Sequence, residues 1–261
     1  MRFDRTKPCN NCPFRVDIPG YLSGVQAQHI IDDLVSDDFG WFACHKSTDT
    51  NEEGERVCVD TTQQCVGSLH LLMKSNAINV ATRLAAAMGE IDLDTLTGSE
   101  EVAVTREAFI IHHALAWGAR QLPLVAELLR DLLDRYAGAP TECDGQTRIV
   151  AHVLTVAGVP FQAWGGTLSC DARHISPHLW ITVGEGQPGE QGCITIDYRR
   201  KMWLGEGITE GVLLPGELGN TNYSDAREIA LGQLDPATLF ALTARFDDLA
   251  ALLAQQRTRA T

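Results

Sequence analysis

The sequence has no apolar stretch near the ~20 residues that a helix needs to cross a bilayer, so we expect no membrane-spanning segment among its 261 residues. Its first residues, MRFDRTKPCNNC, contain no apolar core of the kind found in signal peptides. It also lacks internal repeats and low-complexity tracts, and its composition of 44% hydrophobic and 21% charged residues is typical of globular proteins. We therefore expect a globular protein, and the cytoplasm is the simplest location.

Basic residues are scarce in this chain. It has 21 Lys and Arg against 34 Asp and Glu, for a formal net charge of -13. Nucleic-acid binding depends on clustered positive charge that displaces counterions from phosphates. The only compact basic run is Arg199-Arg200-Lys201. We therefore expect no nucleic-acid partner.

Length and hydrophobic periodicity predict two domains of different construction. Apolar positions at helical spacing predict helices over residues 25–36, 68–89, 105–117, 121–136, 144–157, 225–232 and 235–256. Short apolar runs bounded by turn residues predict strands over residues 160–164, 178–183 and 193–198. The predicted fold is α+β, with a mostly helical domain over residues 1–120 and a domain of helices and a small antiparallel sheet over residues 121–261.

Cysteines are concentrated near the N-terminus, where five of the eight lie between positions 9 and 65. In a reducing compartment such a cluster favours metal ligation over disulfide formation. The spacing Cys9-x-x-Cys12 can direct two sulfurs at one ion, and Cys44-His45, Cys58 and Cys65 supply further ligands. We expect zinc in a structural role, because it is the commoner closed site, with an iron–sulfur cluster as the alternative.

The same region resembles an uncharacterised cysteine-rich domain of phage and bacterial proteins. The resemblance lies in PCNNCPFRVDIPG, FACHKS and QQCVGSL, which follow one another in that order within residues 6–115. It implies the ligand set Cys9, Cys12, Cys44 and Cys65, with His45 as an alternative to Cys44 and with Cys58 outside the pattern. A redox role for Cys9-x-x-Cys12 is disfavoured, because no βαβ pattern surrounds it.

Three residues of the second domain have the settings that a thiol nucleophile requires. Cys143 directly precedes the helix predicted over residues 144–157, and the positive end of a helix favours a thiolate. His178 opens one predicted strand and Asp197 ends the next, so pairing of these strands would place a carboxylate beside the imidazole. Two other histidines are weaker candidates: His152 lies nine residues from Cys143 on the same helix, and His174 lies in an expected loop.

This half of the chain resembles transglutaminase-like and other papain-fold domains of bacteria and phages. The resemblance lies in CDGQTRIVAHVLTVAGVPFQAWGG, SPHLWITVG and ITIDYRRKMWLG, within residues 121–215. It implies Cys143 as nucleophile, His178 as general base and acid, and Asp197 as the orienting acid. The chain departs from the pattern at Pro140-Thr141-Glu142, which offers no Gln or aromatic residue to help bind an oxyanion.

Together these features predict a thiol-dependent acyl-transfer enzyme that hydrolyses or transamidates an amide or ester, with a protein or peptide as a possible substrate. The alternative is a papain-like scaffold without activity that binds a protein partner. The weak match at the oxyanion site favours this alternative, and the reactivity of Cys143 separates the two.

Overall fold

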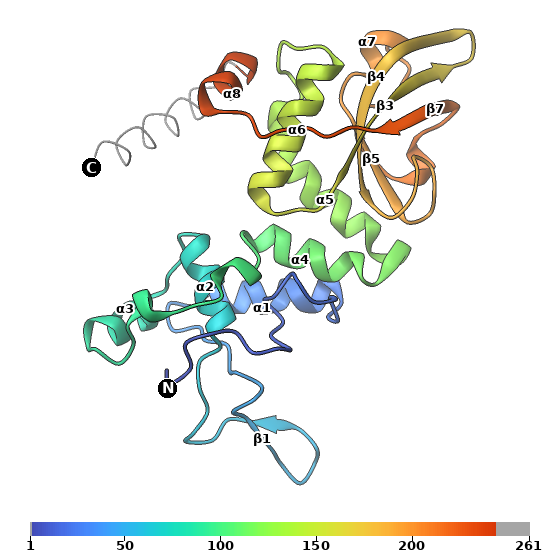
Figure 1. Ribbon diagram of the computed structural model, residues 1–261. Helices are drawn as coiled ribbons and strands as arrows, with labels where there is room; N and C mark the ends of the chain where they lie inside the picture. The colour runs from blue at the N-terminus through green and yellow to red at the C-terminus, as the bar shows by residue number, and fades with distance from the viewer. Residues whose placement is uncertain (1, 244–261) are drawn as a thin grey trace. The chain divides into compact units, whose positions relative to one another are not determined.

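The computed structural model describes residues 2–243, and the chain divides into two compact units, Met1–Trp117 and Gly118–Thr261 (Figure 1). The boundary expected from the sequence stood between residues 120 and 121. Helices and antiparallel sheet occur together, with one two-stranded and one five-stranded sheet, which confirms the α+β class.

The regular structure of the N-terminal unit is helical apart from one two-stranded sheet, and long irregular segments connect its elements. Its elements are α1 (Gly24–Ser36), β1 (Asp49–Thr50), β2 (Arg56–Val57), α2 (Val66–Lys74), α3 (Val80–Ala87), the short 3-10 helices η1 (Leu93–Thr95) and η2 (Ser99–Glu101), and α4 (Arg106–Leu115). Helices α1 and α4 pack against each other. The ring of Phe14, which follows the first cysteine pair, is fully buried between Phe109 (stacked, 4.9 Å) and Phe42 (edge-on, 5.1 Å). The cysteine-rich segment therefore contributes directly to this core.

The single helix expected over residues 68–89 is in fact two helices. Helix α2 ends at Lys74, and Asn76 adopts a left-handed backbone conformation with φ 51°. Asn79 then caps α3 by accepting a hydrogen bond from the backbone N–H of Thr82. Side-chain capping competes with helix continuation at such positions, and apolar periodicity alone did not reveal the break.

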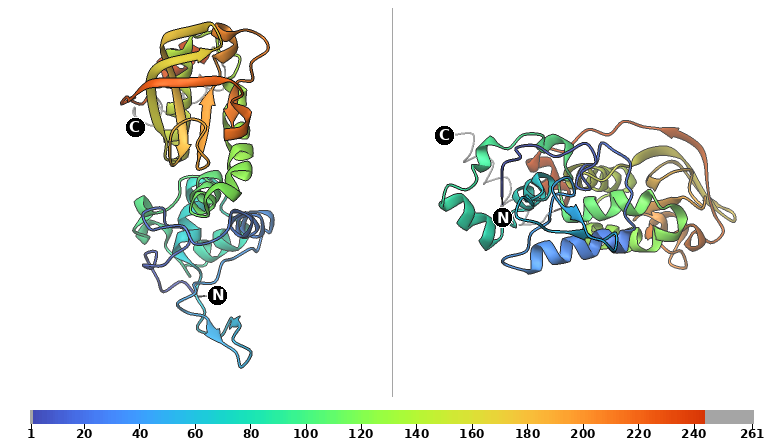
Figure 2. Two further views of the ribbon diagram at one scale, coloured as in Figure 1. Left: turned by 90° about the vertical axis from the view of Figure 1, so that its right-hand side faces the viewer. Right: turned by 90° about the horizontal axis from the view of Figure 1, so that it is seen from below.

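The C-terminal unit is built around an antiparallel sheet with strand order β6-β5-β4-β3-β7. Its elements are η3 (Gly118–Gln121), α5 (Leu122–Leu133), η4 (Asp134–Tyr136), α6 (Cys143–Ala157), β3 (Gln162–Cys170), β4 (Arg173–Gly184), β5 (Cys193–Asp197), α7 (Arg200–Leu204), β6 (Gly211–Leu213), η5 (Pro215–Glu217), β7 (Thr221–Glu228) and α8 (Pro236–Thr243). Helix α6 packs against β4, the central strand (Figures 1 and 2).

Helix α6 ends where the sequence predicts and begins one residue earlier, at Cys143. Gly158 takes the left-handed conformation, φ 76°, that commonly ends a helix, and Pro160 follows it. Its buried residues include Val150, which lines a small cavity with Ile181 and Ile196 of the sheet, and Ile149, which packs with Tyr136, Ala139 and Leu239. Burial of these residues fixes the helix beside β4, so its first residue, Cys143, is held at a defined end of the sheet.

The helix expected over residues 225–232 is wrong, because Thr221–Glu228 forms the edge strand β7, which pairs with β3. Asp225, Arg227 and Glu228 along this strand lack the β-branched character of a typical strand, and an edge strand tolerates such charged residues. The helix expected over residues 235–256 begins as α8, and its remainder lies outside the described residues.

Candidate active site of the C-terminal unit

Cys143 is the first residue of α6 and is only 8% exposed. The N-cap residue Glu142 makes no side-chain hydrogen bond to the first turn, so that turn keeps backbone N–H groups without a side-chain cap. Such groups and the helix dipole stabilise negative charge. The hydroxyl of Thr141 is buried and has no hydrogen-bond partner among the described residues, which leaves a further donor beside this turn.

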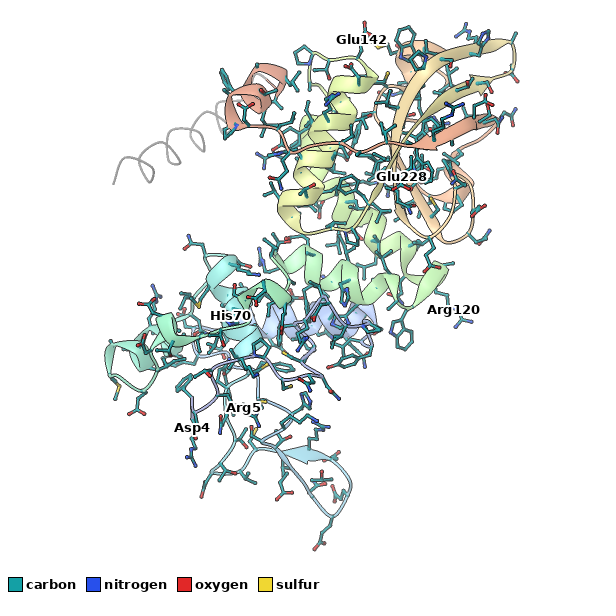
Figure 3. All side chains as sticks on the ribbon, in the orientation of Figure 1. Asp4, Arg5, His70, Arg120, Glu142 and Glu228 are labelled. Carbon is teal, nitrogen blue, oxygen red and sulfur yellow. The ribbon has the colours of Figure 1, made fainter. Side chains whose placement is uncertain are left out.

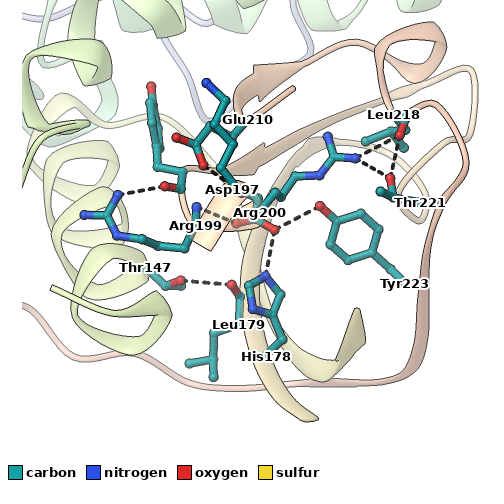
Figure 4. Close-up of polar contacts among 12 residues, drawn as sticks. Thr147, His178, Leu179, Asp197, Arg199, Arg200, Glu210, Leu218, Thr221 and Tyr223 are labelled. Atoms are coloured by element: carbon teal, nitrogen blue, oxygen red, sulfur yellow. Dashed lines mark hydrogen bonds and ion pairs between the residues drawn. The ribbon is translucent and has the colours of Figure 1, made fainter. Parts of the chain in front are cut away.

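His178 is fully buried in β4, and its imidazole is held by Asp197 at the end of β5 (Figure 4). Its Nε2 lies 2.7 Å from Oδ2 of Asp197. The other ring nitrogen, Nδ1, is buried and has no hydrogen bond of good geometry within residues 2–243. A carboxylate on one nitrogen fixes the ring orientation and leaves the other nitrogen to exchange a proton.

The thiol of Cys143 is close enough to influence this imidazole. Burial lowers the pKa of His178, but the hydrogen bonds and charges of Asp197 and Cys143 together outweigh burial and raise the pKa to about 9. The structure therefore brings together the three residues that the sequence singled out, and it favours the protonated form of the histidine at neutral pH.

The strand that carries His178 is longer than expected. Strand β4 begins at Arg173, so His178 lies inside the strand, and His174 lies on the strand and not in a loop. The loop-based reason for setting His174 aside was therefore wrong. Its side chain is exposed and its backbone is paired with Ser169, four residues along β4 from the buried site.

Asp197 is held by donors besides the histidine. Its Oδ1 accepts a hydrogen bond from the backbone N–H of Arg199 (3.0 Å), and its Oδ2 accepts one from the hydroxyl of Tyr223 on β7 (3.0 Å) (Figure 4). Burial, and then Asp197, raises the pKa of the Tyr223 phenol well above its usual value, so this hydroxyl remains a donor. Three donors on one buried carboxylate fix its position beside the imidazole.

Arg199 connects this carboxylate to the segment that leads into Cys143. Its buried guanidinium donates to the backbone oxygens of Ala137 (3.0 Å), Ala139 (2.5 Å) and Thr141 (2.6 Å). It also donates to the side-chain oxygen of Gln146 (2.9 Å) and to the backbone oxygen of Tyr198 (2.7 Å). One residue thus bonds to Asp197 through its backbone and to the turn before the thiol through its side chain.

The basic run Arg199-Arg200-Lys201 is not a surface patch, because Arg199 and Arg200 are 8% and 0% exposed. Arg200 donates to the backbone oxygen of Leu218 (2.8 Å) and to the hydroxyl of Thr221. Sequence reasoning treated the run only as a charge patch and did not identify Arg199 or Tyr223 as parts of the site. The signal that was available is position: Arg199 stands two residues after the orienting acid.

Two glycines provide space at the site. A Cβ at Gly166, which pairs with His178 across β3 and β4, would lie 2.5 Å from the backbone oxygen of Ser224 and 2.8 Å from the ring of Trp180. A Cβ at Gly145 would lie 2.7 Å from the Cβ of Thr141. Side chains at these positions would displace the histidine strand or the turn before Cys143.

The site is closed to solvent in this conformation. The cavity lined by Cys143, Gln146, Asp197 and Arg199 has a volume of about 10 Å³, which is about the space of one water molecule. Any molecule larger than water would therefore require local opening to reach the thiol.

The N-terminal cysteines lie near one another in the other unit. Sγ of Cys12 lies 3.4 Å from Sγ of Cys65, and Sγ of Cys9 lies 3.8 Å from Nε2 of His45. Burial raises the pKa of Cys9, and the neighbouring Cys12 and Cys44 raise it further. Within residues 2–243, no group of three or more His, Cys, Asp or Glu side chains is already gathered as a metal ion would need.

Close packing around Cys12 depends on Gly67, because a Cβ at that position would clash with Sγ of Cys12. Burial lowers the pKa of His45, and the nearby cations Arg56, Lys46 and Arg5 lower it further. Cys58 is exposed and lies on the loop after β2. Cys12 and Cys65 are therefore in contact, and Cys44 is close enough to influence the pKa of Cys9 and of Cys65, whereas Cys58 is exposed.

No helix within the described residues is long and apolar enough to cross a membrane. Compared with known proteins, the chain matches no protein-family model, no curated protein and no solved structure.

Proposed function

We propose that the C-terminal unit is a thiol-dependent acyl-transfer enzyme of the papain-like or transglutaminase-like type. The observation that carries this proposal is the arrangement around the buried His178. Its Nε2 is hydrogen-bonded to Asp197, its Nδ1 has no hydrogen bond of good geometry, and the thiol of Cys143 is close enough to raise its pKa. Nucleophile, base and orienting acid are the parts that thiol catalysis requires.

The chemistry proceeds in two halves. The first half starts from the pair in which the thiol proton of Cys143 already resides on Nδ1 of His178, consistent with the raised pKa of this ring. The sulfur then forms a bond to the substrate carbonyl carbon while the proton stays on the ring. The carbonyl oxygen takes the displaced electron pair, and the backbone N–H of Cys143 and the hydroxyl of Thr141 are the donors we assign to it. Collapse then breaks the carbon–nitrogen or carbon–oxygen bond, and His178 gives its proton to the leaving group.

The second half regenerates the enzyme. Water or an amine attacks the thioester carbon and gives its proton to His178, the carbon–sulfur bond breaks, and the pair of thiolate and protonated His178 is restored. Water yields hydrolysis and an amine yields transamidation, so the triad serves both outcomes. Asp197 stabilises the charged imidazole during both halves.

The first experiment uses p-nitrophenyl acetate as the acyl donor and mass spectrometry of the intact chain. We expect an acetyl adduct on Cys143 that Cys143→Ala abolishes, whereas the matched control Cys170→Ala, in the same unit, forms it normally. Added methylamine then separates hydrolysis from transamidation through the product formed. Full adduct formation and turnover in Cys143→Ala would exclude this mechanism.

A second candidate function is favoured by the closure of the site. The cavity of about 10 Å³ beside Cys143 and the complete burial of His178 suit a scaffold that binds a protein partner and performs no chemistry. In that case Cys143 forms no acetyl adduct in the native chain and reacts with iodoacetamide only after unfolding.

For the N-terminal unit we propose a structural zinc held by Cys9, Cys12, Cys44 and Cys65, with His45 as the alternative to Cys44. The donor chemistry fits: in tetrahedral zinc–thiolate geometry two sulfurs stand about 3.8 Å apart, and Cys12 and Cys65 already stand 3.4 Å apart. Bound zinc would supply folding free energy to this unit. An iron–sulfur cluster is the alternative, because it uses the same four thiolates.

Metal analysis tests this assignment. We expect one zinc per purified chain, lost in Cys12→Ser and Cys65→Ser but retained in Cys58→Ser, the exposed control. Iron and visible absorbance in place of zinc would favour the cluster. A purified chain that contains neither metal, and whose thermal unfolding does not change when a chelator is added, would exclude the site.

A further inference from the structure

Two neighbouring hollows in the N-terminal unit differ in character and share one boundary. The first, of about 470 Å³, is lined mainly by apolar side chains, among them Ile18, Leu22, Ile30 and Phe42. The second, of about 480 Å³, is lined by the cations Arg5, Lys7 and Lys46 together with Pro8 and Cys9. Asn10 and Asn11 line both hollows, so the two open on either side of one turn.

The charge of these hollows is opposite to that of the chain. The chain carries a net charge of -13, yet no residue lining either hollow is acidic. The cationic hollow has three basic side chains, and Arg56 and His45 line the apolar one. Like charges gathered without a counterion repel one another, so a bound anion would stabilise this arrangement.

One side chain that lines the cationic hollow, Arg5, has a donor without a partner. The Nε of Arg5 is buried and makes no hydrogen bond within the described part of the chain. Arg5 is labelled in Figure 3, on the segment that precedes α1. A buried donor without a partner costs free energy, and a bound anion offsets this cost when the Arg5 side chain turns the atom toward the hollow.

We propose that these two hollows form one binding site for a small phosphomonoester, with its phosphate in the cationic hollow and its apolar portion in the adjacent hollow. A phosphomonoester carries nearly two negative charges at neutral pH, which suits three cations better than the single charge of a carboxylate. Both volumes are within the range of small-molecule sites. This site is independent of the proposed acyl-transfer reaction.

The cations have another explanation, which is that they offset negative charge on the cysteine thiolates. Lys46 lies two residues from Cys44 in sequence, and Cys9 lines the same hollow as Lys46. The two explanations differ in outcome. Cations that only offset thiolate charge affect metal retention, whereas cations that bind a ligand affect its affinity while the metal content stays constant.

Calorimetric titration of the full chain, as purified, tests the site with four probes: 1-naphthyl phosphate, inorganic phosphate, 1-naphthol and 1-naphthoate. We expect 1-naphthyl phosphate to bind more tightly than each of the others, because it alone fills both hollows with the preferred charge. Equal affinity for 1-naphthyl phosphate and inorganic phosphate, or tighter binding of 1-naphthoate, would overturn the proposal.

Variants separate the two halves of the site. Arg5→Gln and Lys46→Gln should each weaken 1-naphthyl phosphate about tenfold, as expected for a lost charge-assisted hydrogen bond. Ile30→Ala should weaken it without changing the affinity for inorganic phosphate. The control Arg83→Gln alters an exposed cation on α3 outside both hollows and should change neither affinity.

Metal content and thermal unfolding are measured for each variant, so that a folding defect is recognised and Lys7→Gln then replaces the affected variant. Unchanged affinity in Arg5→Gln, Lys46→Gln and Lys7→Gln would overturn the proposal in favour of charge compensation. Displacement of 1-naphthyl phosphate by oligothymidylate at lower concentration than by inorganic phosphate would also overturn it and indicate a nucleic-acid surface.

Discussion

The two units each bury a histidine between hydrogen-bond partners, and the two rings are held in opposite protonation states. The hydrogen bonds of His113 on α4 go to backbone groups: its Nε2 lies 2.9 Å from the backbone oxygen of Pro13, and its Nδ1 accepts from the backbone N–H groups of Tyr21 and Leu22. Burial lowers its pKa to about 4. His178 is buried too, yet its pKa is raised to about 9.

The difference shows how the partners of a buried histidine decide its protonation state. Neutral backbone partners satisfy the ring of His113, so burial decides its protonation and the ring joins α4 to residues 13–22. A carboxylate and a thiol beside His178 reverse the effect of burial. Burying Asp197 as well costs free energy that a purely structural position avoids, and such perturbed groups occur most often at functional sites.

The largest effect is expected from removal of the carboxylate that distinguishes His178 from His113. Asp197→Asn removes the carboxylate, so the pKa of His178 should fall below 6.5, toward the behaviour of His113. Acetylation by p-nitrophenyl acetate should slow at least about 100-fold, because the ring loses its orienting charge. Histidine NMR titration measures both rings, and His113 is the internal control. A pKa of His178 that stays near 9 would contradict the role of Asp197.

The next effect concerns Arg199, which has no counterpart beside His113. The side chain of Arg199 donates to five oxygens, whereas the lysine in Arg199→Lys has at most three N–H donors. Because buried oxygens then lose their hydrogen-bond partners, the C-terminal unit should lose roughly 2–4 kcal/mol of stability. Urea unfolding followed by hydrogen exchange measures each unit separately. Arg148→Lys, an exposed position on α6, is the matched control. Equal stability of the two variants would show that Arg199 does not hold the turn before Cys143.

The same comparison predicts opposite pH dependence of the two units. For His113 the folded pKa is depressed, so its contribution to stability is complete above 6.5 and is lost as pH falls toward 4. For His178 the folded pKa is raised, so its contribution is complete below 6.5 and is lost as pH rises through 9. Hydrogen exchange resolved by unit checks both directions.

Substitutions identify which ring is responsible. His113→Gln should flatten only the acid limb of the N-terminal unit, and His178→Gln should flatten only the alkaline limb of the C-terminal unit. Parallel pH profiles in the two wild-type units would contradict the assignment.

The smallest effect is expected from the loss of a single hydrogen bond to Asp197. Tyr223→Phe deletes one of the donors to Asp197, and the carboxylate oxygen keeps its bond to His178. We expect a loss of about 1 kcal/mol in the stability of the C-terminal unit, with His178 still protonated at neutral pH. A loss as large as that of Arg199→Lys would make Tyr223 a structural support equal to the arginine.

Local patterns were enough to predict several parts of the structure. The helix after Cys143, the strands around His178 and Asp197, and the α+β class all follow from periodicity and turn residues, because these signals act within a few positions of the chain. Periodicity failed where partners decide: the charged segment over residues 221–228 became a strand because β3 offers it an edge.

The sequence alone supplies the residue types that a thiol site and a metal site would use, and the order in which they follow one another. Only the tertiary structure decided that Cys143, His178 and Asp197 meet, that Arg199 and Tyr223 hold the acid, and that Arg5, Lys7 and Lys46 converge. The physical reason is that pKa, burial and hydrogen bonding depend on neighbours brought together by folding, which spacing along the chain does not encode.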